Sequence, residues 1–390
     1  MSLPTITFNI ASNGLGQTQA DIQKTPGMVL TGTTVAGAGN VTTGEKYTIY
    51  SLPEAEAKGI TSTGVNAYAY KQIADFYSVA LAGAELNFML APVAASLENM
   101  VDVTQAYAKK LLADAGGKIR ILGIGKKSGT TETITDGLDA DVHLSVIKAQ
   151  ALAEDFATRY QPLRIIIGGN KFSGNAGDLK DYSATSLNRT SILISNNDNS
   201  KDAAIGLLLG RLASIPTQRK IWRVLDGPIS QAGYFTNSTN VDALSTAWGA
   251  IHNKNYIFMR SFTGRNGYYF SSDVTLTKAT DDYKTLSRGL VMDEAVLIAY
   301  NKLVEKLGEE VPVTVDGKIH PAIVKSWQTD TDKEVRDLMV RTGKLSDLKV
   351  YIDQNQNVVT SGNFNVSIQL LPVGYAEYIT VNIGFTANIE

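Results

Sequence analysis

The last twelve residues of the chain alternate between apolar and polar side chains without interruption. A period of two residues is typical of a strand with one buried face. The N-terminus carries a shorter version of the same pattern. Both ends are therefore predicted to be strands, and each becomes an arm that pairs with a neighbouring molecule if the chain's own sheets cannot take it. The predicted arm residues are Thr5, Ile6, Thr7, Phe8, Asn9 and Ile10 at the start, and Ile379, Val381, Ile383, Phe385, Ala387 and Ile389 at the end.

The composition is that of an ordinary globular protein. With 390 residues, 44% hydrophobic residues and a net charge of −2, the chain can bury a large core and divides into about two domains. Lys and Arg never occur more than two in a row, which argues against a nucleic-acid partner. The absence of cysteine excludes disulfides and thiolate chemistry. We also expect no signal peptide and no direct stable membrane insertion, so the chain should remain in the cytoplasm until something else exports or releases it.

Strand and helix patterns alternate through the first two thirds of the chain. Several predicted strands, such as Ile165-Ile166-Ile167, are continuously apolar, which is typical of a parallel sheet buried on both faces. The expected fold class is therefore α/β, with a mostly parallel sheet and helices on both faces. The main predicted strands are 86–90, 119–124, 163–167 and 192–194, the main helices are 101–113, 144–160, 203–212 and 241–251, and a hairpin is expected over 256–262 and 268–271.

The last third predicts a smaller α+β domain. Two helices are expected, 286–307 and 330–340, followed by strands 348–352 and 364–370 and then the C-terminal strand. On the second helix, Val335, Leu338 and Met339 should face the sheet. The outer edge of so small a sheet could receive strands from partners. The predicted divisions are an N-terminal arm (1–20), an α/β domain (21–277), a C-terminal assembly domain (278–371) and a C-terminal arm (372–390).

No constellation of residues indicates catalysis. The histidines His143, His252 and His320 are far apart, without HxxxH or HExxH spacing, so a metal site is not expected. A glycine-rich loop follows the strand 119–124, but Gly123, Gly125 and Gly129 fit neither the GxxxxGK[ST] spacing of a P-loop nor a dinucleotide fingerprint. We predict no catalytic, cofactor-binding or metal-binding residues. An α/β enzyme with an unrecognised active site remains the alternative.

The order of parts resembles the contractile tail sheath proteins of bacteriophages and related contractile injection systems. In the last third, Thr280-Asp281-Asp282-Tyr283 leads into Val291-Met292-Asp293-Glu294-Ala295, and Thr342-Gly343-Lys344-Leu345 follows. The middle segment 203–226 and the start 5–32, with Gly27-Met28-Val29-Leu30-Thr31-Gly32, also resemble parts of a sheath subunit. The resemblance thus touches both ends and the middle of the chain.

Membership of that family implies a structural role. Sheath subunits form six-membered rings stacked as a helix around an inner tube, and arms of neighbours add strands to a third subunit's C-terminal sheet. Contraction after a baseplate trigger drives the tube through a membrane without nucleotide hydrolysis. The implied partners are the chain itself, an inner tube protein, and baseplate and terminator proteins. The implied location is a virion tail or a released or cytoplasmic contractile particle, made in the bacterial cytoplasm. The implied acceptor sheet is Leu348, Val350, Ile352, Phe364, Val366, Ile368 and Leu370, and the tube-facing candidates are Lys333, Glu334, Arg336, Asp337, Arg341 and Lys344.

Overall fold

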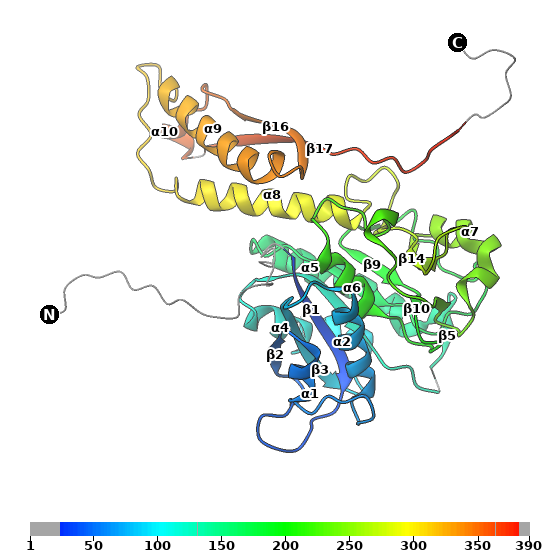
Figure 1. The fold of residues 1–390 in the computed structure, drawn as a ribbon. Helices are drawn as coiled ribbons and strands as arrows, with labels where there is room; N and C mark the ends of the chain where they lie inside the picture. Colours follow the sequence, from blue (N-terminus) through cyan, green and yellow to red (C-terminus); the bar gives the residue numbers. More distant parts are fainter. Residues whose placement is uncertain (1–23, 131, 363, 382–390) are drawn as a thin grey trace, which may run out of the picture. The chain divides into compact units, whose positions relative to one another are not determined.

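The computed structural model describes residues 24–130, 132–362 and 364–381 (Figure 1). The chain forms two compact units, Met1–Val296 and Leu297–Glu390. The predicted N-terminal arm lies outside the described residues, as does the predicted C-terminal strand beyond Val381.

The first unit is built on a sheet of seven strands in the order β12-β9-β7-β4-β1-β3-β2. All neighbouring pairs are parallel except β2 with β3. This confirms the predicted mostly parallel sheet. The strands are β1 (Thr25–Gly32), β2 (Lys46–Ile49), β3 (Leu86–Pro92), β4 (Ile119–Gly125), β7 (Arg164–Gly168), β9 (Thr190–Leu193) and β12 (Tyr256–Ile257).

Helices lie on both faces of this sheet. On one face α2 (Ala67–Val79) packs against α6 (Ile205–Ser214), and on the other α5 (Ala140–Thr158) packs against α3 (Leu97–Val101) (Figure 1). Glycine allows α6 to approach α2 closely, because a Cβ on Gly206 would overlap the carbonyl oxygen of Gln72. The remaining helices of the first unit are α1 (Leu52–Glu56), α4 (Ala108–Asp114), η2 (Val224–Asp226), η3 (Val241–Ala247) and α7 (Trp248–Asn253), and α8 (Leu286–Val304) runs on into the second unit.

Two predicted helices of the first unit are wrong as single helices. The helix predicted over 101–113 is interrupted, because the Asp102 carboxylate accepts the backbone N–H of Thr104 at 2.8 Å and ends α3. Helix α4 starts only at Ala108. The helix predicted over 241–251 begins as the 3₁₀ helix η3, in which Leu244 has non-helical torsions, and becomes α-helical only in α7.

The predicted hairpin is correct only at its centre. β13 (Met259–Arg260) pairs antiparallel with β14 (Tyr269–Phe270), whereas β12 belongs to the edge of the seven-stranded sheet. The other short antiparallel pairs are β5 (Ile134–Thr135) with β6 (Leu138–Asp139), β8 (Ser186–Leu187) with β15 (Leu276–Thr277), and β10 (Ser195–Asn196) with β11 (Tyr234–Phe235).

The second unit contains a helix and a hairpin. Helix α9 (Pro321–Val335) continues into one π-helical turn, η4 (Arg336–Val340), and β16 (Leu345–Ile352) pairs antiparallel with β17 (Val366–Pro372). A short helix, α10 (Val358–Ser361), lies between the strands. The predicted start of this helix at residue 330 is wrong. Pro321 occupies the first turn and the His320 side chain accepts the N–H of Ala322 at 3.3 Å, so the helix begins nine residues earlier.

The core of the second unit is small. Ile319, Val324, Trp327 and Ile352 are buried together, and Phe364 packs on Trp327 with ring centroids 4.5 Å apart. Such a core stabilises less than that of the first unit, because stabilisation scales with buried apolar area.

Candidate assembly surfaces

The β16–β17 hairpin places the predicted acceptor residues in register. Leu348 lies opposite Leu370, Val350 opposite Ile368 and Ile352 opposite Val366, so these six side chains share one face. The β16 members of these pairs are buried, at 2 to 5% exposure, whereas the β17 members are only half-buried. Phe364 is also half-buried. The apolar face is thus incompletely covered on the β17 side.

Helix α9 and η4 hold this hairpin through side chains spaced four residues apart. Gln328 Nε2 donates to the carbonyl of Val350 at 2.7 Å, and Arg336 Nη2 donates to the carbonyl of Leu348 at 2.8 Å. Asp332 pairs with Arg336 at 2.9 Å. Sequence reasoning missed Gln328 and Asp332, although the spacing of 328, 332 and 336 places all three on one helix face.

Arg336 has a structural role that its sequence position did not indicate. Besides Asp332, its guanidinium pairs with Asp347 of β16 at 2.6 Å. The hydrogen bonds that Arg336 donates to the carboxylates of Asp332 and Asp347 raise the pKa of Arg336, and the bond to Asp347 lowers the pKa of that carboxyl. Arg336 was expected to be an outward-facing charge, but its side chain bridges the helix and the hairpin.

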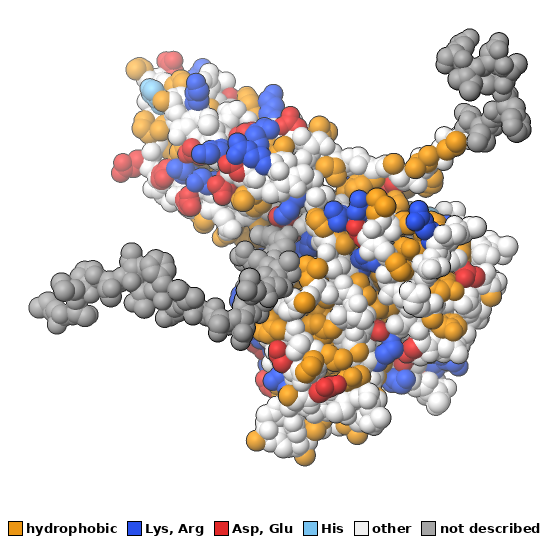
Figure 2. All heavy atoms as spheres, viewed as in Figure 1, with side chains coloured by type: hydrophobic (Ala, Val, Ile, Leu, Met, Phe, Trp, Pro, Cys, Tyr) orange, Lys and Arg blue, Asp and Glu red, His pale blue; other side chains and the backbone are white. Residues whose placement is uncertain are grey.

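The remaining tube-facing candidates differ in exposure. Lys333 and Glu334 are exposed, and Lys344 is half-buried. Arg341, whose side chain is 71% exposed, pairs with Asp337 at 2.9 Å. Val335 and Met339 are buried as predicted, but Leu338 is 44% exposed, because the π-helical turn rotates it away from the sheet. Figure 2 shows Lys and Arg intermingled with Asp and Glu on this unit.

The described part of the C-terminal tail forms no strand. Residues 373–381 have no regular secondary structure, and Tyr378, Ile379 and Val381 are 88%, 79% and 73% exposed. Large apolar side chains with this exposure are unfavourable in water unless a partner covers them.

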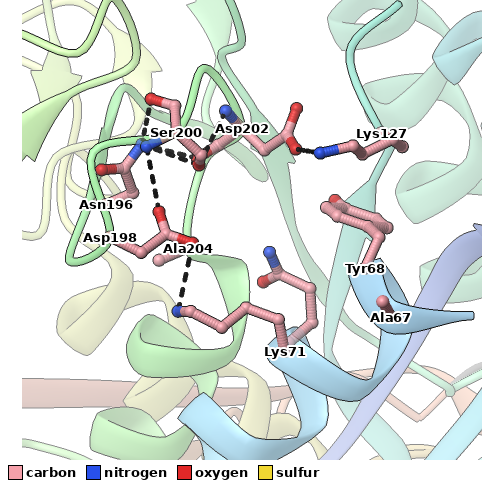
Figure 3. Close-up of a pocket in the computed structure, with 10 residues that line it drawn as sticks. Ala67, Tyr68, Lys71, Lys127, Asn196, Asp198, Ser200, Asp202 and Ala204 are labelled. Carbon is pink, nitrogen blue, oxygen red and sulfur yellow. Dashed lines mark hydrogen bonds and ion pairs between the residues drawn. The ribbon is translucent and has the colours of Figure 1, made fainter. Parts of the chain in front are cut away.

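The first unit has a crevice at the carboxyl ends of its parallel strands, where α/β proteins commonly bind ligands. After β1 the chain forms the edge strand β2 and then β3 on one side of β1, and later β4 on the other side, and the glycine-rich loop follows β4. A cavity of about 260 Å³ lies nearby. It is lined by Ala67, Tyr68, Lys71, Gln72, Lys127, Asn196, Asp198, Ser200, Asp202 and Ala204 (Figure 3).

The lysine side chains that line this crevice form ion pairs with carboxylates of the chain itself. Lys127 pairs with Asp202 at 2.9 Å, and the same carboxylate accepts the N–H of Ser128 at 2.7 Å. Lys71 pairs with Asp75. It also pairs with Asp198 at 3.8 Å (Figure 3). Burial raises the pKa of Asp75, although Lys71 opposes this shift. The groups that would bind a phosphate are thus already bonded within the chain.

Two further residues near the crevice, Tyr68 and Lys126, have shifted pKa values that their packing explains. The pKa of Tyr68 is raised well above its usual range, mainly by burial and to a smaller extent by the nearby Asp202 carboxylate. The phenol therefore stays neutral. Burial lowers the pKa of Lys126, but Asp139 and Asp141 outweigh it and raise the pKa overall. These shifts arise from packing and ion pairing rather than from a substrate site.

The predicted absence of a metal site can be examined at the histidines. Nδ1 of His143 lies 2.8 Å from the Tyr182 hydroxyl and Nε2 lies 3.0 Å from the carbonyl of Thr135, and burial lowers its pKa. His320 caps α9. Within residues 24–130, 132–362 and 364–381, no three His, Cys, Asp or Glu side chains gather as possible metal ligands. None of the helices in these ranges has the length and apolar character needed to cross a bilayer.

Comparison with known proteins identifies the family. Residues 3–273 match the DUF2586 N-terminal domain, and residues 282–390 match the DUF2586 C-terminal domain. No curated protein matches the chain.

Solved structures share the fold over the full length. A chain of the anti-feeding prophage helical sheath in the contracted state has 15% identity and a TM-score of 0.62, with 100% of each chain covered. A chain of the 6-fold symmetrised anti-feeding prophage baseplate has 14% identity and the same TM-score and coverage. A chain of the contracted sheath complex of PVC, an extracellular contractile injection system, has 10% identity and a TM-score of 0.60, with 100% of this chain and 98% of that chain covered. The chain therefore belongs to the DUF2586 family and has the fold of contractile injection system sheath proteins, as the sequence resemblance predicted.

Proposed function

We propose that the chain is the repeating subunit of a contractile sheath. It assembles as stacked hexameric rings around an inner tube, and the sheath shortens to drive the tube through a target membrane. The observation that carries this proposal is the likeness of the whole chain, with both units included, to subunits of contracted sheaths. The half-covered hairpin in the second unit provides a place where neighbouring copies can join.

The subunit performs mechanical work without chemistry. The energy is stored in an extended lattice and released when subunits reach better-packed contacts. Each unit moves as a rigid body, and the links to the arms, residues 11–19 and 372–377, absorb the backbone change. They contain Gly14, Gly16 and Gly374, which tolerate torsions that other residues rarely adopt.

The arms connect the copies. Each arm supplies several backbone hydrogen bonds worth about 0.5–1.5 kcal/mol net apiece, together with burial of its apolar side chains. Such strand pairing persists while the subunits rotate. The further partners are the inner tube protein and the baseplate and terminator proteins, with no nucleic acid involved.

Electron microscopy of the purified full-length protein tests the proposal. We expect hollow helical tubes of six-fold rings, and with tube and baseplate proteins present we expect extended particles that contract once in nucleotide-free buffer. A protein that remains monomeric at high concentration and in the presence of tube protein contradicts the proposal. So does contraction that requires ATP.

A further inference from the structure

Arg260 lies between two aromatic rings at the surface of the first unit. In the β13–β14 pair, Met259 and the opposing Phe270 are fully buried, and Arg260 points to the other face. Its guanidinium carbon is 5.3 Å from the ring centroid of Trp248 and 4.3 Å from that of Phe262. Both distances are typical of a cation–π interaction. The three side chains are half-buried, and we call them the Arg260 clamp.

Contacts within the first unit hold both rings of the clamp in place. Nε1 of Trp248 donates to the carbonyl of Val241 at 3.0 Å. The ring of Phe262 meets that of Tyr269, the residue opposite Arg260, in an edge-on contact with centroids 5.4 Å apart. The clamp is therefore formed before any partner binds, which lowers the entropic cost of binding.

The charge of Arg260 has no partner within the described part of the chain. Its Nε is buried without a hydrogen bond, and neither Nη nitrogen forms a hydrogen bond or an ion pair there. Asp242 accepts the hydroxyls of Ser261 and Tyr268 at 2.7 and 3.0 Å instead. Burial lowers the pKa of Arg260, and no carboxylate of the described residues opposes that shift. The guanidinium thus lacks the counter-charge that a partly desolvated cation usually has.

The open end of the guanidinium fits a carboxylate. Unlike Nε, the two Nη nitrogens are not buried, so they can donate hydrogen bonds to a group outside the subunit. The fork of a guanidinium matches the two oxygens of a carboxylate, and Arg and Trp are enriched at the energetic centres of protein interfaces. The net charge of −2 and the lack of longer basic runs argue against a nucleic-acid phosphate. The clamp therefore favours an acidic side chain of a protein.

The chain itself offers matching carboxylates. Several of its acidic side chains are exposed and form no ion pair within residues 24–130, 132–362 and 364–381, namely Asp282, Glu310, Asp316, Asp330 and Glu334. In an assembly of identical subunits every copy brings both the clamp and these carboxylates. A head-to-tail contact between them can therefore repeat from copy to copy.

We infer that the Arg260 clamp binds a carboxylate side chain of a second copy of the chain through the Nη nitrogens of Arg260. The clamp belongs to the first unit, so this contact is separate from those of the arms and of the β16–β17 hairpin. The inference rests on the proposed function and names a contact that joins neighbouring subunits.

Carbodiimide cross-linking tests the contact, because it joins an amine to a carboxylate only where the two touch. Arg260→Lys places an amine in the clamp, and the activated carboxylate forms an amide with it. Plain and isotope-labelled copies of the variant are mixed before assembly, so that mass spectrometry distinguishes links between copies from links within one copy. Arg265→Lys is the matched control, because Arg265 is exposed in the loop of the same hairpin and no described ring stacks on it.

We expect the peptide with Arg260→Lys to link to a carboxylate of another copy in assembled tubes, and the peptide with Arg265→Lys not to. Arg260→Gln should raise the protein concentration needed for tubes about tenfold, as loss of an interface hot spot does, while Arg265→Gln should leave it unchanged. Phenylglyoxal, which modifies accessible guanidinium groups, tests the unaltered protein, because tubes should protect Arg260 compared with the unassembled subunit.

The possible failures are distinguishable. Tubes without a link at position 260, in which the wild-type Arg260 also stays as reactive as in the unassembled subunit, overturn the inference and leave the sheath proposal standing. A link to the inner tube protein in place of a second copy overturns the assigned occupant. So does binding of a single-stranded oligonucleotide that Arg260→Gln abolishes and Arg265→Gln does not. A wild-type protein that forms no tubes overturns both the inference and the proposed function.

Discussion

Arg164 and Asp293 form a buried bidentate ion pair that joins β7 to α8. Nε and Nη2 of Arg164 donate to the carboxylate at 2.8 and 3.1 Å, and the two side chains are 1% and 6% exposed. Arg189 approaches the same carboxylate at 3.2 Å. Gly289 makes room for the arrangement, because a Cβ there would overlap the guanidinium of Arg164. The start of α8 is therefore fixed to the parallel sheet.

We expect Asp293→Asn to lower the free energy of unfolding of the first unit by about 3–5 kcal/mol, because it leaves a buried guanidinium without its counter-charge. Urea denaturation followed by circular dichroism measures this loss. The control is Asp155→Asn, which removes an i,i+4 pair with the 51% exposed Arg159 and should cost about 1 kcal/mol or less. A loss for Asp293→Asn no larger than that of the control contradicts the anchoring role.

Glu132 should make the first unit sensitive to acid. Burial raises its pKa, but hydrogen bonds from Lys171 and from the N–H of Gly129 outweigh this and lower the pKa from the ordinary 4.5 to about 2. A carboxylate with a lowered folded-state pKa stabilises the fold fully above its unfolded pKa, and this stabilisation is lost as the pH falls through the folded value. The affected window is therefore from about pH 4.5 down to about pH 2.

Glu132→Gln should remove this part of the acid dependence. Between pH 6 and pH 3, the urea midpoint of the wild type should fall further than that of the variant. Glu309→Gln, which removes an exposed i,i+3 pair with Lys306, serves as the control and should follow the wild type. Parallel pH profiles for the wild type and Glu132→Gln would show that the two hydrogen bonds do not stabilise the fold.

Local patterns predicted the α/β architecture because each buried strand is a continuous apolar run. The central strands at Met28-Val29-Leu30 and Ile165-Ile166-Ile167 are fully buried in the parallel sheet, as their composition indicates. The helix boundaries were less predictable. The break at Asp102 depends on its side chain accepting the N–H of Thr104, and the early start of α9 depends on a histidine cap, which is not among the usual capping residues.

For the candidate assembly surfaces, the sequence predicted which segments are strands, but not how other elements pack on those strands. The alternation of β16 and β17 identified their apolar faces, yet no local pattern indicates that α9 covers β16 more fully than β17. Likewise the role of Arg336 depends on Asp347, which is eleven residues away and on another element. Pairings of this kind follow from tertiary packing, which single-sequence periodicity does not contain.

Deleting residues 379–390 should leave a folded, soluble subunit that cannot form tubes. The described part of this segment is exposed and unpaired with the hairpin, so its removal takes no core residue away. Circular dichroism should be unchanged, while electron microscopy should show no helical assemblies. Deleting residues 1–10 should have the same effect. Normal polymerisation of either truncated protein contradicts the role of the arms.

A milder variant distinguishes lost strand pairing from a general loss of the terminus. Replacing Ile383, Phe385 and Ile389 together by Asp keeps the length of the tail but puts three charges on its apolar face, and should also abolish tubes. The matched control replaces Thr380, Asn382 and Asn388 by Ser on the polar face and should assemble normally. If both triple variants assemble alike, the alternation of the tail is not what joins the copies.

Charge reversal should separate attachment to the inner tube from folding of the second unit. Arg341→Glu changes a side chain that is 71% exposed and pairs only locally with Asp337, so folding should be unaffected. If η4 faces the tube, attachment should weaken and become more sensitive to salt.

Arg336→Met should instead loosen the hairpin, because it removes the bonds to Asp332, Asp347 and the Leu348 carbonyl. Hydrogen exchange of β16 measures folding of the hairpin. Co-sedimentation with the tube over a range of salt concentrations measures attachment. The charge-matched control for Arg341→Glu is Lys318→Glu, in the turn before α9. Unchanged co-sedimentation of Arg341→Glu would remove this turn from the tube interface, whereas unchanged exchange in Arg336→Met would show that Gln328 and the apolar core suffice to hold the hairpin.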